Sequence, residues 1–258
     1  MNIVVCVKIA PDPEDLEIGS DGSVSTAHAE WSIGGFDLPA LEAGVRLAEM
    51  HGGKVIALSA GPSSINQSKI KKDILSRGAD ELVLVVDETL QDASTAETAR
   101  VLAAAIHKME DVQLAFFGEG SADLYFQQTG AQVGERLGWL CLNAVQDVRL
   151  IQEGMLQVQR TLDVELQVLD VPLPAALSVT SDICEPRLAS MRAILQASRK
   201  PVIEWSLADI GIENLAASVE ILAVQAPPRT SRKGVVLGGS VEEAVRSLLN
   251  NLKKEGVL

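Results

Sequence analysis

The sequence of 258 residues has few of the side chains that mark a catalytic or disulfide-rich protein. It contains three histidines and three cysteines, and aromatic residues make up only 3% of it. The cysteines, Cys6, Cys141 and Cys184, are widely spaced and odd in number, which argues against a disulfide framework or a cysteine metal cluster. The scarcity of aromatics predicts an aliphatic, alanine-rich core. We therefore expect a protein of a reducing compartment, the cytoplasm.

Charge and hydropathy argue against two further classes of protein. The formal net charge is −13, whereas binding to nucleic acid rewards clustered lysine and arginine. No apolar run approaches the ~20 residues that span a bilayer, and residues 1–7 are typical of a strand rather than a signal peptide. Apolar residues make up 47% of the chain, as in a globular protein. We expect no nucleic-acid partner and no membrane insertion.

The sequence also offers no obvious nucleophile or general base. His28, His51 and His107 fall in a turn, at a helix end and on the polar side of a helix, so we expect all three at the surface. Cys6 lies inside an apolar run and is interpreted as a small buried hydrophobe. The chain has no Ser/His/Asp grouping, no HExxH motif and no CxxC motif. We expect neither catalytic residues nor a metal site.

Apolar runs alternate with helical patterns through the first half of the chain. Strands are predicted at 2–7, 54–59, 81–86 and 113–117, and helices at 38–50, 61–76, 94–109 and 131–137, with a turn-rich segment at 11–33. Strand, helix and strand at these intervals indicate βαβ units with right-handed crossovers. The first half therefore predicts an α/β fold with a mainly parallel, doubly wound sheet.

The pattern changes after residue 140. Short, partly alternating runs at 144–151, 155–161 and 165–169 predict an antiparallel meander. A strand at 173–180 is expected to return to the sheet, and a short helix is expected at 190–197. We expect residues 1–214 to form one nucleotide-binding α/β domain.

Residues 215–258 lack the dense core pattern of the rest. An isolated strand is predicted at 221–226, a basic, extended link at 227–233 and an amphipathic helix at 241–252. These elements cannot form a core alone, so this C-terminal arm must pack on the domain or on a partner subunit.

Three turns at predicted strand carboxyl ends are small or polar. They lie at residues 8–12, 59–63 and 118–130, and the longest contains Gly118, Gly120, Ser121 and Gln127. Ligands of open α/β sheets bind at the carboxyl ends of the strands, near the point where the strand order reverses. The 118–130 turn is neither a GxGxxG fingerprint nor a P-loop, yet a helix start after it favours phosphate. The three turns together indicate a nucleotide pocket.

Blocks of sequence in a fixed order resemble the β subunits of electron transfer flavoproteins. The blocks with this resemblance are Val4-Val-Cys-Val-Lys8 with Pro11-Asp12, Phe36-Asp37 with Ala40-Leu-Glu-Ala43, residues 56–62, Arg77-Gly-Ala-Asp80, Asp123 to Gly130, Glu185-Pro-Arg187, and Ser190 to Ala197. The order and spacing hold from residue 1 to about 233. Gly118-Glu-Gly-Ser and Ser181-Asp182 are more similar to the FixA-type branch than to the mitochondrial type.

The resemblance implies a non-enzymatic electron carrier with an adenine nucleotide α-hydrolase-like fold. In this family the β subunit forms a heterodimer with an α subunit that carries the redox-active FAD, and the β subunit itself holds AMP or, in electron-bifurcating members, a second FAD. Carried over by motif, the cofactor-binding residues are Cys6, Lys8, Gly34, Gly35, Phe36, Asp37, Ala60, Asp123, Gln127, Gln128, Thr129, Gly130, Gln132, Val133 and Gly134. Asp123 is expected to accept from a ribose hydroxyl or to orient the turn.

The resemblance also assigns two contact regions. The helix at 190–197 resembles the recognition loop that docks on acyl-CoA dehydrogenases, with Leu188, Met191 and Ile194 as apolar anchors. The alternative is that Met191 is buried in the core of this chain. The arm is expected to wrap the α subunit, as it does in the family.

Some positions depart from the family, and two other functions stay open. Gly34-Gly35 replaces the usual Asn-Pro, Asp123-Leu-Tyr125 replaces an acidic run, and Thr129 stands where bifurcating members usually have valine. AMP and FAD therefore both remain candidates, as does bifurcation. The first rival is a stand-alone nucleotide-binding protein of the universal-stress type, which needs no arm. The second is a nucleotide-hydrolysing enzyme, which would need a basic phosphate clamp.

Overall fold

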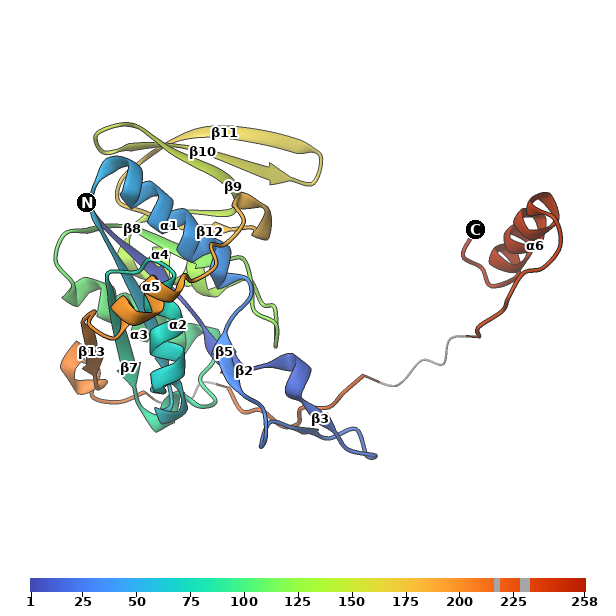
Figure 1. Cartoon of the computed structure of the whole chain (residues 1–258), viewed down its shortest axis with the longest axis horizontal. Helices are drawn as coiled ribbons and strands as arrows, with labels where there is room; N and C mark the ends of the chain where they lie inside the picture. Colours follow the sequence, from blue (N-terminus) through green and yellow to red (C-terminus); the bar gives the residue numbers. More distant parts are fainter. Residues whose placement is uncertain (216–218, 228–232) are drawn as a thin grey trace.

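A nine-stranded sheet forms the centre of the protein (Figure 1). The computed structural model describes residues 1–215, 219–227 and 233–258. The strand order is β11-β10-β9-β12-β8-β1-β6-β7-β13. Neighbouring strands from β9 to β13 in this order run parallel. These strands are β9 (Leu140–Gln152), β12 (Ala175–Val179), β8 (Val112–Gly118), β1 (Asn2–Cys6), β6 (Lys54–Gly61), β7 (Glu81–Val86) and β13 (Val202–Trp205).

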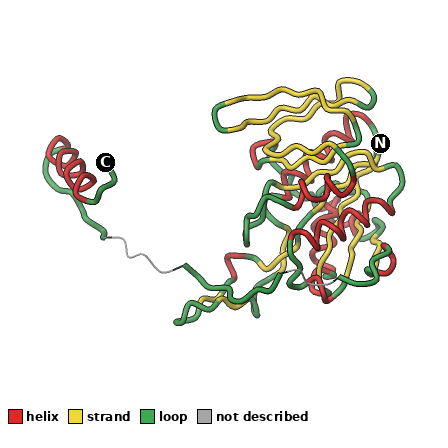
Figure 2. The backbone as a smooth tube through the Cα atoms, turned by 180° about the vertical axis from the view of Figure 1, so that it is seen from behind, coloured by secondary structure: helices red, strands yellow, loops and turns green. Residues whose placement is uncertain are grey.

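Helices cover both faces of this sheet, as Figure 2 shows from behind. Alternate residues of a strand point to opposite faces. Accordingly Ile3 and Val5 of β1 pack with one cluster, and Val4 and Cys6 with another. The first cluster includes buried residues of α1 (Asp37–His51) and α2 (Ser68–Ser76), and the second those of α3 (Thr95–Lys108) and α4 (Thr129–Leu137). The predicted doubly wound α/β fold is confirmed.

The strand order reverses between β1 and β8. From β1 the chain continues through β6 and β7 on one side, then crosses to β8 on the other side of β1. The carboxyl ends of β1 and β8 lie side by side, with Cys6 paired to Phe117. A ligand of a doubly wound sheet binds at such a switch point. The predicted turns at residues 8–12 and 118–130 begin there.

The predicted antiparallel meander is present and extends the sheet. β10 (Met155–Leu162) pairs with both β9 and β11 (Glu165–Pro172) in antiparallel register. Leu156, Val158 and Val171 are fully or almost fully buried in the same core as α1. β12 then inserts between β8 and β9 as the expected returning strand.

Several boundaries differ from the prediction. The helix expected at 61–76 is a 3₁₀ turn, Ser63–Ile65, followed by α2, because the backbone of Gln67 is extended (φ −96°, ψ 139°). The turn-rich segment at 11–33 contains two small antiparallel pairs. These are β2 (Ile9–Pro11) with β5 (Trp31–Ile33), and β3 (Glu17–Ile18) with β4 (Val24–Ser25). Further 3₁₀ turns are Pro13–Asp15, Glu88–Leu90, Ser181–Ile183 and Ala208–Ile210.

The predicted strand at 221–226 is wrong. This segment makes only an isolated bridge between Gln225 and Ser23, with the Ala226 N–H donating to the Gly22 carbonyl at 2.8 Å. β13, which was not predicted, occupies the sheet edge beside β7. The apolar side chains Ile221, Leu222 and Val224 of the segment stay exposed. Of the basic link at 227–233, residues 228–232 lie outside the described residues.

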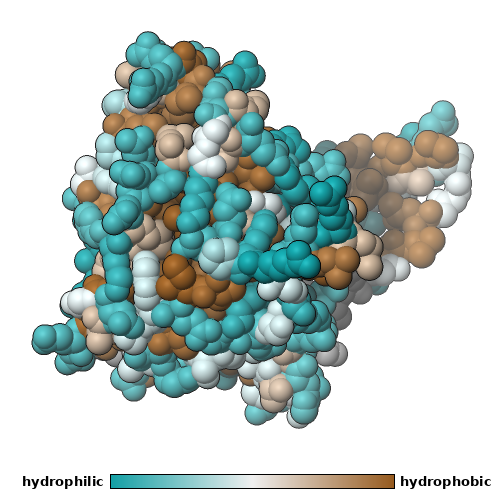
Figure 3. Space-filling model, turned by 60° about the vertical axis from the view of Figure 1, so that its left-hand side comes forward, coloured by the Kyte–Doolittle hydropathy of each residue, from teal (hydrophilic) through white to brown (hydrophobic). Residues whose placement is uncertain are grey.

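The last helix, α6 (Val241–Lys254), lies apart from the sheet in Figure 1, in agreement with the predicted amphipathic helix. A capping box between Ser240 and Glu243 starts it. Figure 3 shows hydrophobic residues on this separated part. In the described ranges, we found no helix with the length and apolar character needed to cross a membrane.

Candidate functional site

A buried carboxylate joins the two turns at the switch point. The Lys8 backbone N–H, just after β1, donates to Asp37 Oδ2 at 2.6 Å, and the Gly118 backbone N–H, at the end of β8, donates to Asp37 Oδ1 at 3.2 Å. Asp37 is the first residue of α1 and is 6% exposed. The Gly34 N–H also donates to the Lys8 carbonyl at 2.8 Å. Asp37 is therefore positioned to fix the turns rather than to project into solvent.

Burial raises the pKa of Asp37 to about 7, although the hydrogen bonds from Lys8 and Gly118 oppose this rise. Removing water from a carboxylate disfavours its charged form, and two backbone donors offset only part of that cost. The same environment raises the pKa of Cys6, first through burial and then through the charge of Asp37. Cys6 is therefore a buried thiol in the wall of the site, as the sequence predicted, and not a reactive thiolate.

Two charged side chains meet above the turns. Lys8 Nζ donates to Asp123 Oδ2 at 2.5 Å, and both side chains are nearly half exposed. Burial raises the pKa of Asp123, but hydrogen bonds from Lys8 and Ser121 outweigh it, so the pKa lies below its usual value. Beside this pair the rings of Phe36 and Tyr125 are tilted against each other, with centroids 5.2 Å apart. The site thus combines one cation, one accepting carboxylate and an aromatic surface.

The start of α4 supplies further polar groups. Its N-cap residue, Gln128, makes no side-chain capping bond, so the first N–H groups of the helix keep their donor capacity. The Gln132 amide lies 3.4 Å from Thr95 Oγ1 and 3.4 Å from Gln128 Oε1. Gln132 Oε1 is buried without a hydrogen-bond partner in the described structure. A buried orphan acceptor favours a ligand or water donor at this position.

The predicted cofactor residues differ in how they lie in the structure. Lys8, Phe36, Asp37, Asp123, Gln128 and Gln132 supply the groups described above, whereas Gly130, Val133 and Gly134 are buried in packing. A side chain on Gly130 would meet Ser178 Oγ at 2.2 Å, and one on Gly134 would meet Cys141 Cβ at 2.9 Å. These two glycines allow close packing of α4. Of the others, Ala60 and Thr129 are half-buried, Gly34 abuts Asp37, and Gly35 and Gln127 are exposed.

Sequence reasoning did not assign Thr95 to the site, whereas Gly118 and Tyr125 belong to the predicted 118–130 turn without a role of their own. Thr95 approaches from α3, the helix that packs beside α4, and no local motif predicts that contact. Tyr125 has a positive φ of 48°, as does Gln127 at 57°, so the turn is tightly wound. The close approach of Gly120 to the Tyr125 ring explains the glycine, since an added Cβ would lie 2.4 Å from the ring.

Gly118→Ala should destabilise the protein by about 1–3 kcal/mol, the usual cost of overpacking. An alanine Cβ would lie 2.5 Å from the Phe36 carbonyl oxygen and 2.5 Å from Asp37 Oδ1. The first atom belongs to the backbone and cannot rotate away. Urea unfolding measures the change, with Gly35→Ala as the control because its Cβ would meet nothing within 4 Å. Equal stability of the two variants would contradict the close packing of Phe36 on β8.

A separate surface cavity of about 250 Å³ lies beside the 3₁₀ turn Glu88–Leu90. It is lined by Glu88, Thr89, Gln91, Asp92, Ala93, Glu97, Leu215 and Val219. None of these residues belongs to the predicted cofactor set, and the lining is acidic. We therefore place the candidate site at the switch point, where the chemistry of the side chains suits a nucleotide.

The predicted docking residues are exposed. Leu188 is 92% exposed, Met191 76% and Ile194 38%, and Leu195, which was not predicted, is 71% exposed. These residues lie before and along α5 (Met191–Ala197). Ser190 caps the N-terminus of this helix, because its Oγ accepts a hydrogen bond from the Ala193 N–H. The alternative that Met191 is buried in the core is wrong.

Histidines and acids do not gather into a metal site in the described residues. His28, His51 and His107 are exposed, as predicted. Of the other two cysteines, Cys141 and Cys184 are half-buried, and burial raises the pKa of each.

Comparison with protein families identifies a matching family model. The family model described as the electron transfer flavoprotein domain matches residues 21–210. The match runs from β4 and β5 through α1, the 118–130 turn, the meander and α5 to the 3₁₀ turn Ala208–Ile210, whereas β1 and the 8–12 turn with Lys8 lie outside it. It spans well over half of the chain and includes most of the candidate site. The chain therefore belongs to the electron transfer flavoprotein domain family.

Proposed function

We propose that this chain is the β-type subunit of a heterodimeric electron transfer flavoprotein of the FixA-like branch. It binds AMP or a second FAD at the switch point and takes part in passing electrons between a dehydrogenase and the FAD of an α subunit. The observation that carries the proposal is the convergence of Lys8, Asp123 and the uncapped start of α4 on turns that Asp37 holds together. Membership of the electron transfer flavoprotein family supports it.

The residues of the site fit an adenine nucleotide. The Phe36 and Tyr125 rings offer a partly exposed aromatic surface for a purine. The start of α4 and the Lys8 ammonium are suited to a phosphate. Asp123 can accept from a ribose hydroxyl, and Gln132 Oε1 is a further acceptor without a partner. Because Asp123 neutralises the only lysine of the described site, one phosphate group is easier to accommodate than several.

The chain itself supplies position rather than acid–base chemistry. A bound flavin of the complex would supply the redox centre. The groups of this subunit bind and orient the nucleotide, and the rigid sheet fixes the site relative to the docking surfaces. A buried thiol and a carboxylate engaged by two backbone donors are consistent with such a supporting role.

Two surfaces of the chain suit protein partners. The apolar side chains Val241, Val245, Leu248 and Leu249 of α6 are exposed, and the stripe they form needs a cover that the separated helix does not find in the described body. We assign that cover to the α subunit. The exposed side chains before and along α5 are assigned to a dehydrogenase of the acyl-CoA dehydrogenase type.

Lys8→Met should weaken AMP binding by about tenfold, since a charge-assisted contact contributes roughly 1.5–3 kcal/mol, of which the exposed ion pair with Asp123 offsets a part. Calorimetric titration of the purified chain with AMP and with FAD measures the affinities. Lys72→Met, at an exposed position on α2, is the control.

Equal affinity of the Lys8 and Lys72 variants would contradict the assigned phosphate position. Binding of neither AMP nor FAD by the wild type would contradict the nucleotide site itself. Tight AMP binding by a stand-alone homodimer that forms no flavin-containing complex would instead favour a nucleotide-binding protein of the universal-stress type.

A further inference from the structure

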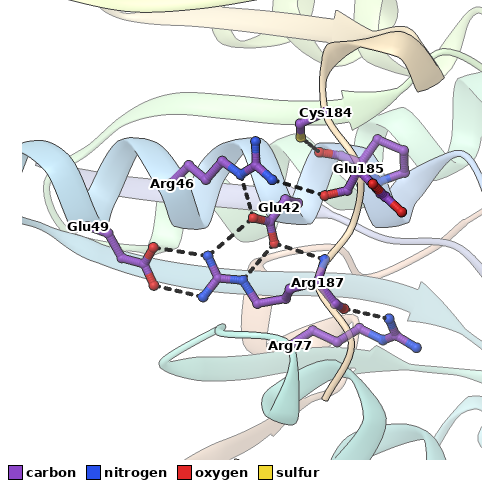
Figure 4. Close-up of polar contacts among 8 residues, drawn as sticks. Glu42, Arg46, Glu49, Arg77, Cys184, Glu185 and Arg187 are labelled. Atoms are coloured by element: carbon purple, nitrogen blue, oxygen red, sulfur yellow. Dashed lines mark hydrogen bonds and ion pairs between the residues drawn. The ribbon is translucent and has the colours of Figure 1, made fainter. Parts of the chain in front are cut away.

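A buried carboxylate on α1 is held by two arginines (Figure 4). Glu42 is 3% exposed. Its Oε2 accepts from Arg187 Nε at 2.6 Å and from the Arg187 backbone N–H at 3.2 Å, and its Oε1 accepts from Arg46 Nε at 2.6 Å. A buried charge is tolerated only when it is paired in this way. The pKa of Glu42 is lowered because the bonds from Arg187 and Arg46 outweigh its burial.

Arg187 binds a second carboxylate at the same time. Its Nη1 and Nη2 donate to the two oxygens of Glu49 at 2.7 and 3.0 Å. Glu42 and Glu49 both belong to α1, so the guanidinium of Arg187 binds this helix at two positions (Figure 4). A planar guanidinium that binds a carboxylate through two parallel hydrogen bonds fixes the orientation of the two side chains better than a lysine ammonium could.

The backbone around Arg187 is fixed as well. Arg46 Nη2 donates to the Glu185 carbonyl at 3.1 Å, and Arg77 Nη1 donates to the Arg187 carbonyl at 3.3 Å. Arg77 directly follows α2 and pairs with Asp73 at 2.9 Å. Residues 185–187 are therefore tied to both helices on this face of the sheet.

The segment is tied down again after α5. Lys200 Nζ donates to the Leu75 carbonyl in the last turn of α2 at 2.9 Å, and to the Ala79 carbonyl just after that helix at 2.5 Å. Between these two attachments, Leu188, Met191 and Leu195 remain more than two-thirds exposed. We call residues 188–197 the docking strip. Apolar side chains that point outward from a segment held at both ends form a prepared surface rather than a loose loop.

We propose that Arg187 is a positioning residue that fixes the docking strip on α1, and thereby sets its place relative to the nucleotide site. α1 begins with Asp37, which holds the switch-point turns, and Glu42 follows about 7.5 Å along the same helix at 1.5 Å per residue. A strip ordered in advance loses less conformational entropy when a partner binds. The docking role rests on the function proposed above, whereas the holding of the strip by Arg187 does not.

Arg187→Gln tests the proposal in two measurements. Hydrogen exchange at the amides of residues 191–197 should become at least about tenfold faster, since local opening controls their protection. In the flavin-loaded heterodimer, KM for the reduced dehydrogenase should rise about tenfold while kcat and AMP affinity stay close to wild type. Arg187→Lys should bring the exchange rates and KM only part of the way back to the wild-type values, because an ammonium lacks the several planar N–H donors that bind both glutamates.

Two further variants keep the test decisive. Glu49→Gln removes one of the two carboxylates at an exposed position and should give a smaller change of the same kind without leaving Glu42 unpaired. Arg149→Gln removes the exposed pair with Asp147 on β9 and should change neither measurement.

Unchanged exchange in the 191–197 amides of a folded Arg187→Gln protein would overturn the proposal, and so would faster exchange with an unchanged KM. If the wild-type heterodimer accepts no electrons from any dehydrogenase, the proposed function fails, and the exchange rates alone then decide whether Arg187 holds the strip.

Discussion

Replacing Val245 and Leu249 by glutamate should abolish the heterodimer at micromolar concentration. Both side chains lie on the exposed apolar stripe of α6, at 50% and 45% exposure. Covering such side chains contributes about 1–2 kcal/mol each, and a carboxylate placed in an apolar interface adds a desolvation cost. We therefore expect at least a hundredfold loss of affinity for the α subunit. Co-purification of a tagged α subunit with this chain measures it.

The control for this pair is Ser247→Glu, a substitution on α6 outside the apolar stripe. It adds one of the two negative charges of the double variant and should leave the heterodimer intact. The α/β body should keep its thermal unfolding temperature in all variants, because α6 lies apart from it. Wild-type affinity in the double variant would show that the arm does not hold the partner.

Asp37 should make the protein less stable as the pH rises from about 4 to about 7. Its pKa is about 7 in the folded protein and 3.8 as a free side chain. The folded state therefore keeps a proton that the unfolded chain releases, so the stabilising effect is present below pH 4 and is lost as the pH passes through 7. A difference of this size corresponds to roughly 4 kcal/mol. Urea unfolding at several pH values measures it.

Asp37→Asn is the matched variant for this pH dependence, because the amide has nearly the same shape and does not titrate. Subtracting its unfolding free energies from those of the wild type removes the opposite contributions of Glu42, Glu49 and Asp123, whose pKa values are lowered. The difference should fall with rising pH between 4 and 7 and stay flat above that range. A difference that is constant from pH 4 to 8 would show that Asp37 stays ionised throughout.

The parts of the fold that could be predicted depend on local patterns. The buried run at 81–86 and the helical pattern at 94–109 identify a strand and a helix without any knowledge of the rest of the chain. The strand at 221–226 was wrong for the complementary reason. Its apolar residues suit a strand, but β13 pairs with β7 instead, and this segment makes only the isolated bridge between Gln225 and Ser23. Such competition is decided by the whole fold and not by the segment.

The candidate site likewise has residues that local sequence signals could identify and contacts that they could not. Lys8, Asp37 and Asp123 could be chosen because they follow predicted strands or match a family motif. That Asp37 faces inward and holds Lys8 and Gly118, and that Thr95 reaches Gln128 from α3, depends on packing between distant elements. Arg187 belonged to a motif, but its two glutamate partners lie more than 130 residues away in sequence.

Co-expression with an α subunit of the family, followed by analysis of the bound ligands, tests the central claim most directly. The purified material would be measured for stoichiometry, for flavin absorbance and for the mass of each nucleotide released on denaturation. We expect a one-to-one heterodimer that contains flavin and releases either AMP with one FAD or two FAD. A chain that stays apart from every α subunit and releases no adenine nucleotide would contradict the proposed function.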